Sequence, residues 1–178
     1  LKSFFLTPVR MRYRMHSVCY RTQMLRDGGY RQTEGVSYTD QEWVFYPLFE
    51  VGRVVFADIP LYIYNLTREG QTMDPRVMLR SLAGLVAVTE AMSERFATTD
   101  VGAMSPKRRA FLQEALRRRH RVVYRLWLLA MPDNEFSSAE FEAFDQRMTM
   151  LAEQCALGPI VVPVNNVLGF DLLGRWRR

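Results

Sequence analysis

The chain has 178 residues, of which 48% are hydrophobic and 24% are charged. A chain of this size and composition can bury a core and should fold as one domain, or as one domain with an appendage, so a disordered protein is not expected. The net charge of +5 favours anionic partners only weakly, and no apolar run reaches the roughly 18 residues that a membrane span requires.

The two cysteines, Cys19 and Cys155, have no metal-ligand or redox spacing. This usage suits a reducing compartment and predicts a cytoplasmic protein. The first residue is Leu1, and no charged start with an apolar signal segment follows it. We therefore interpret the sequence as an internal fragment of a longer protein.

The first half of the chain has a mixed pattern. Apolar and arginine residues alternate over residues 10–15, which predicts a half-buried strand, although a short helix is also compatible. Residues 17–30 read as an extended lead-in and a helix that ends at Gly28 or Gly29. Asp40 can serve as the N-cap of a helix that continues to Gly52. The branched and aromatic stretches "RVVFAD" (residues 53–58) and "LYIYNL" (61–66) predict two strands.

The second half of the chain reads as helical. Asp74 can cap a helix with Pro75 at its first position, and Ser105 with Pro106 repeats this signal before a long basic helix that ends near residue 130. The stretch "SSAE" (residues 137–140) has capping-box spacing before a further amphipathic helix, and residues 165–178 can hold a short one.

Asp40 and Glu42 are the carboxylates of most interest. They lie two residues apart, so on a helix they diverge and cannot act as a facing acid pair. One interpretation is an N-cap aspartate beside an exposed glutamate. The other is an aspartate at a helix start, flanked by Tyr38 and Trp43, that accepts a proton from a substrate hydroxyl.

Three other motifs are less specific. "LTREGQTM" (residues 66–73) can wrap a phosphate or form an ordinary surface turn. His16 and His120 are the only histidines, too few partners for a metal site or a hydrolase triad. The run "RRRHR" (117–121) spreads its charge round a helix and has no interleaved aromatic residues, so we expect no nucleic-acid partner. A solvated helix, or one that contacts an anionic membrane surface together with "GRWRR", fits better.

Four motifs follow one another between residues 15 and 73: "YRTQMLRDGG", the aromatic-x-Asp-x-Glu-aromatic pattern in "YTDQEW", "VVFADIPLYIY" and the Arg-x-x-Gln-Thr loop "REGQT". Their order and spacing resemble the C-terminal half of the catalytic domain of family 2 glycosyltransferases. These are the inverting GT-A enzymes of bacterial surface polysaccharide synthesis. The likeness covers about a third of the chain.

The resemblance implies roles for particular residues. The aspartate that matches Asp40 is the catalytic base, which deprotonates the acceptor hydroxyl as it attacks a nucleotide-activated sugar. Glu42 matches an Asp-x-Glu subgroup, whereas Thr39 stands where many relatives have glutamate. The substrate-binding residues that the likeness suggests are His16, Tyr38, Glu42 and Trp43 on the acceptor side, and Arg68, Gln71 and Thr72 near the donor diphosphate.

The resemblance also implies what the chain lacks, because nothing before residue 15 supplies the nucleotide-binding half with its Asp-x-Asp metal motif. We therefore expect an α+β fold, with a partial GT-A-like, acceptor-side region at residues 1–74 and a mainly helical extension at 75–178. The fragment alone should be inactive and hold no metal. The full-length enzyme would use a nucleotide sugar, a glycan acceptor and Mg²⁺ or Mn²⁺, at the inner membrane face or in the cytoplasm. A sheet cut in half presents an unpaired strand, through which a homodimer could form.

A second hypothesis is a non-catalytic helical module that docks a partner protein or an anionic membrane surface. It predicts that Asp40 serves purely as a cap and that the largest apolar surface lies on the helices. The glycosyltransferase hypothesis predicts strands before residue 75, helices after it and an Asp40 that is exposed on a concave edge.

Overall fold

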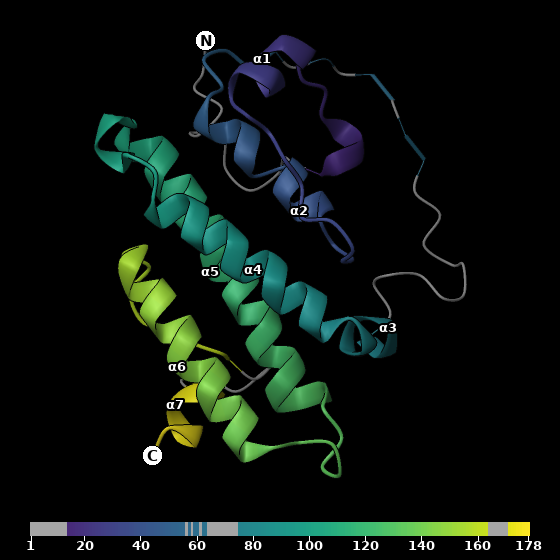
Figure 1. Cartoon of the computed structure of the whole chain (residues 1–178), viewed down its shortest axis with the longest axis vertical. Coiled ribbons are helices and arrows are strands. Elements are labelled where there is room, and N and C mark those ends of the chain that lie inside the picture. The colour runs from purple at the N-terminus through teal and green to yellow at the C-terminus, as the bar shows by residue number, and fades with distance from the viewer. Residues whose placement is uncertain (1–13, 56, 58, 61, 64–74, 164–170) are drawn as a thin grey trace.

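The computed structural model describes residues 14–55, 57, 59–60, 62–63, 75–163 and 171–178, and in these ranges the chain is mostly helical (Figure 1). The expected α+β fold is therefore wrong. No strand forms among the described residues, where the only β-type pairing is a single bridge between Pro163 and Asp171. The described parts of the two predicted strands lie extended, with Val55 81% and Ile63 93% exposed. Their branched residues suit a sheet, but a strand needs neighbours to complete its hydrogen bonds, and an isolated hairpin is only marginally stable.

The first described elements are short. The 3-10 turn η2 (Met15–Ser17) occupies the end of the stretch with alternating residues, whose earlier part lies outside the described residues. Helix α1 (Thr22–Asp27) ends as predicted at the two glycines. Gly29 has φ +61°, and the Tyr30 amide donates to the Leu25 carbonyl at 2.9 Å, a pairing that needs a left-handed residue at this point.

The helix predicted from Asp40 to Gly52 is divided in two. It forms α2 (Asp40–Trp43) and the 3-10 turn η3 (Tyr46–Phe49). Pro47 supplies the physical reason, because it has no amide proton and its ring obstructs the preceding turn. The short turns that replace one continuous helix still bury Leu48 and Phe49.

The helical second half agrees with the sequence. It contains α3 (Pro75–Arg80), α4 (Leu82–Ala97), the 3-10 turn η4 (Val101–Ala103), α5 (Pro106–Arg125), the π-helical turn η5 (Leu126–Ala130), α6 (Ser138–Gln154) and α7 (Leu172–Trp176). The Ser105 hydroxyl accepts from the Arg108 amide and the Ser137 hydroxyl from the Glu140 amide, each at 3.3 Å, so both serine caps are confirmed.

Helices α4, α5 and α6 pack together, and their core continues into the N-terminal elements (Figure 1). Phe45 is 1% and Leu48 2% exposed, in one cluster with residues of the long helices. The Arg108 guanidinium on α5 donates to the backbone carbonyls of Phe49 and Val51. The long helices therefore hold α2 and η3 in place.

Two buried polar clusters join the long helices. Between α4 and α5, the Ser93 hydroxyl lies 3.0 Å from Nε2 of His120, and both residues are fully buried. Near the C-terminus, Asp145 accepts hydrogen bonds from the Tyr124 hydroxyl at 2.7 Å and from two guanidinium nitrogens of Arg177 at 3.0 and 2.6 Å. The second cluster attaches the chain just beyond α7 to α5 and α6.

Candidate functional site

Asp40 is the first residue of α2 and not its cap. The N-cap position is Thr39, which has helical backbone angles and makes no side-chain capping bond. The Asp40 carboxylate is half-buried and accepts a hydrogen bond from Nε2 of its neighbour Gln41 at 2.8 Å. The N-cap interpretation of Asp40 is therefore wrong, although the backbone amides of Asp40 and Gln41 in the first turn of α2 still lower the pKa of this carboxylate.

Burial raises the pKa of the Asp40 carboxyl above its usual value. The Gln41 hydrogen bond, the positive charge of Arg119 on α5 and nearby backbone amides oppose this shift without cancelling it. Burial in turn lowers the pKa of Arg119, while the charge of Asp40 acts against that change. A half-desolvated carboxylate is a stronger proton acceptor than one in water, because its charged form is less stabilised.

The backbone just before Asp40 is strained. Tyr38 has φ +71°, in the left-handed region, where a bulky L-residue costs of order 1–2 kcal/mol. Desolvation, and then the negative charge of Asp40, raise the pKa of the Tyr38 hydroxyl. Strain of this kind persists only where the surroundings fix it, and such positions cluster at functional sites.

Glu42 is buried, so the interpretation of it as an exposed glutamate is wrong. One carboxylate oxygen accepts from the Thr33 amide at 2.7 Å, and the other accepts from the Thr33 hydroxyl at 2.7 Å and the Tyr46 hydroxyl at 3.0 Å. These bonds fasten the loop before α2 to the helix. A substrate contact by Glu42 stays a prediction, and the carboxylate is already satisfied by donors from the protein.

Three aromatic contacts lie on α2 or beside it. The Trp43 ring makes edge contacts with Tyr20 and Tyr30, with ring centroids 4.9 and 5.5 Å apart. His16 lies in η2, which packs against α2, and its ring stacks on Tyr62 at 4.5 Å. The acceptor-side residues predicted from the sequence therefore lie on α2 or on elements close to it.

The donor-side residues cannot be placed. Arg68, Gln71 and Thr72 lie outside the described residues, so their predicted position near a diphosphate stays a prediction.

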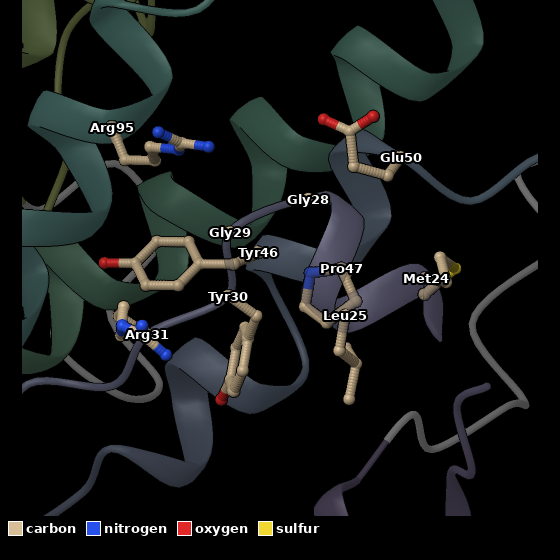
Figure 2. A pocket seen from close by; sticks show the side chains of 10 residues that line it. All are labelled: Met24, Leu25, Gly28, Gly29, Tyr30, Arg31, Tyr46, Pro47, Glu50 and Arg95. Carbon is tan, nitrogen blue, oxygen red and sulfur yellow. The ribbon is translucent and has the colours of Figure 1, made fainter. Parts of the chain in front are cut away.

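A cleft of about 300 Å³ lies between α1, η3 and α4, and the sequence-based predictions did not include it (Figure 2). Its lining includes Arg31, Tyr46 and, from α4, Arg95. Asp40 is not among the lining residues. Since the arginines lie far apart along the chain and in no shared motif, local pattern gives no signal that they line one cleft.

No family model, curated protein or solved structure matches the chain. Among the described residues, no three histidine, cysteine, aspartate or glutamate side chains gather in a way that could hold a metal ion. None of the helices in the described ranges combines the length and apolar character needed to cross a membrane.

Proposed function

We propose that the chain is the acceptor-side part of a family 2 glycosyltransferase and that Asp40 is its general base. The observation that carries this proposal is the state of the Asp40 carboxylate, which is half-buried, has a raised pKa and does not occupy the N-cap position of α2. The strained Tyr38 backbone and the nearby rings of Trp43 and His16 add to it. The four ordered motifs of residues 15–73 suggest the reaction class.

In this proposal Asp40 accepts the proton of an acceptor hydroxyl. As the acceptor hydroxyl loses this proton, its oxygen forms a bond to the anomeric carbon of a nucleotide sugar, and the bond from that carbon to the diphosphate breaks. The diphosphate departs with the electron pair, and the anomeric configuration inverts. Because α2 is held by buried side chains of η3 and by the Glu42 hydrogen bonds, the carboxylate starts in a fixed position.

The donor and its metal belong to the remainder of such an enzyme. The described residues offer no set of ligands for the Mg²⁺ or Mn²⁺ expected of the full-length protein. The part of the reaction that we assign to this chain is therefore proton acceptance at Asp40 and the positioning of that carboxylate.

The basic run 117–121 counts against the membrane-docking alternative, because much of its charge is used within the protein. Arg117 donates to the Leu157 carbonyl at 2.6 Å, and Arg118 pairs with Glu114 at 3.2 Å. Burial lowers the pKa of Arg119 while the charge of Asp40 acts against that change, and His120 is fully buried. A helix that docked on anionic lipid would present these groups outward.

The distribution of exposed apolar side chains points the same way. The most exposed large ones, Val55 and Ile63, belong to the extended stretch before α3, together with Ile59 and Tyr62. The docking-module hypothesis placed its largest apolar surface on the helices. On the described helices and turns, the exposed large apolar side chains are Met15, Leu129 and Met150, which lie on three different elements.

The test is sugar transfer by the full-length protein that contains this chain, with a panel of nucleotide sugars and Mg²⁺ or Mn²⁺ present. Asp40→Asn removes the proton acceptor and keeps the shape, so turnover should fall by about 10²-fold or more. Asp27→Asn is the matched control, since that carboxylate is exposed on α1 and, among the described residues, bonds Gln23 alone. Circular dichroism verifies that both variants fold.

Turnover of Asp40→Asn within a few fold of the unchanged protein would remove Asp40 from the mechanism. Full-length protein that transfers sugar from no nucleotide donor, with correct folding established, would contradict the proposed reaction class itself.

A further inference from the structure

The cleft of Figure 2 contains two guanidinium groups that the proposed reaction does not use. Arg31 lies after α1 and Arg95 near the end of α4, and both are exposed side chains that line the same cleft with the Tyr46 ring. Within the described residues, neither guanidinium has an ion pair or a hydrogen bond. Glu50 also lines the cleft and lies close to Gly28, so the lining carries two positive side chains and one negative one.

The rest of the lining suits a small polar molecule with one flat face. Met24, Leu25 and Pro47 supply an apolar wall that the sticks of Figure 2 place away from the Tyr46 hydroxyl and Arg95. The cleft volume of about 300 Å³ is at the lower end of the range for small-molecule sites. This size suits a monosaccharide better than a nucleotide.

Tyr30 lines the cleft with its ring. Its hydroxyl is buried, and the groups that raise its pKa beside burial are Glu42 and Tyr20, so it faces the α2 side and not the cleft. A ligand in the cleft therefore contacts the ring of Tyr30 and not its hydroxyl.

We propose that this cleft binds a monosaccharide phosphate, with the phosphate held by Arg31 and Arg95 and the sugar against the apolar wall. A phosphate monoester carries close to two negative charges at neutral pH, which matches two guanidinium groups, whereas a carboxylate needs only one. The proposal does not depend on the role of Asp40, which lies outside the cleft lining. The cleft does adjoin α2 through Tyr46, which donates to Glu42, and through Tyr30, which contacts Trp43.

Titration calorimetry of the chain with glucose 1-phosphate tests the proposal, with inorganic phosphate, glucose and glucuronate as comparison probes. Arg31→Gln and Arg95→Gln should each weaken glucose 1-phosphate binding by about tenfold or more, since each removes a charge-assisted contact. Arg26→Gln is the matched control, because that arginine is exposed on α1 outside the cleft and should leave affinity unchanged.

Binding of glucose 1-phosphate that exceeds each comparison probe and depends on Arg31 and Arg95 would support the site. Equal or tighter binding of glucuronate would overturn the assignment to phosphate, and equal binding of inorganic phosphate would overturn the sugar contact. Binding that Arg26→Gln weakens equally would reflect general charge attraction and would overturn the site. No detectable binding at millimolar concentration would also refute the proposal. None of these results alters the test of Asp40, so the two proposals fail separately.

Discussion

His120 should make the stability of the chain depend on pH through one buried ring. Its side chain is fully buried, with Nε2 beside the Ser93 hydroxyl and Nδ1 without a hydrogen-bond partner in the described structure. Desolvation lowers the pKa of His120 from 6.5 to about 4. The folded state therefore keeps the ring neutral at pH values where the unfolded chain already binds a proton.

The sign of the effect follows from proton uptake. Between about pH 6.5 and 4 the unfolded state binds more protons, so the free energy of unfolding declines as the pH falls. The folded state begins to take up the proton only near its own pKa. With 1.36 kcal/mol per pKa unit, the His120 contribution lost from about pH 7.5 to 5 is about 2 kcal/mol, rising to about 3 kcal/mol by pH 4.

Urea unfolding of the chain and of His120→Gln at several pH values measures this contribution. Glutamine does not titrate and can still hydrogen-bond Ser93. The unfolding free energy of the unchanged chain, minus that of His120→Gln, should therefore fall by about 2 kcal/mol between pH 7.5 and 5. Both chains contain the same carboxylates, so the pH dependence that these groups cause is the same in both and cancels in that difference. His16→Gln, at the only other histidine, is the control and should parallel the unchanged chain more closely. A difference for His120→Gln that is constant across this range would refute the reasoning.

Three further predictions concern stability at neutral pH, read from urea or thermal unfolding. Ala156 has φ +51° just after α6, so Ala156→Gly should stabilise the fold by about 1 kcal/mol. Gly29 occupies the equivalent place after α1, so Gly29→Ala should cost a similar amount. Stability changes of the same sign for the two variants would contradict this. Glu42→Gln should cost about 2 kcal/mol of stability, because the amide group that replaces one carboxylate oxygen is a donor and would face the donors that now bond Glu42. Glu50 is exposed, so Glu50→Gln should change stability by no more than about 0.5 kcal/mol. Equal effects would count against a structural role for Glu42. Asp145→Asn should cost about 1–3 kcal/mol and speed proteolysis near α7, and unchanged proteolysis would show that this cluster does not secure the C-terminus.

The helices could be predicted from sequence wherever their ends are encoded locally. Ser105 with Pro106, Ser137, and the glycine pair after α1 each satisfy backbone groups within a few residues, and each boundary agrees with the structure. Strand pairing is not local in this way. The stretches at residues 53–58 and 61–66 have strand composition, but their described parts form no strand pairing with other described residues.

The candidate site was only partly predictable for a related reason. Asp40, Tyr38 and Trp43 share one short motif, so sequence could group them. The burial of Glu42 depends on Thr33 in the preceding loop, and the charge that faces Asp40 comes from Arg119 on α5. The first contact depends on the shape of a loop nine residues away and the second on a helix far along the chain, and no periodicity within α2 carries that information.

The position of Asp40 therefore depends on residues on both sides of the expected boundary at residue 75. Phe45 and Leu48 pack into the core built by the long helices, and Arg108 on α5 binds the carbonyls that follow η3. Arg119 on the same helix lowers the cost of a charged, half-buried carboxylate at Asp40. Through Arg108 and Arg119, α5 therefore interacts directly with the segment that carries Asp40 and is more than an extension that follows it. On this packing, α5 forms part of the support for the proposed catalytic residue, and changes on α5 should reach the reaction through Asp40 as well as through stability.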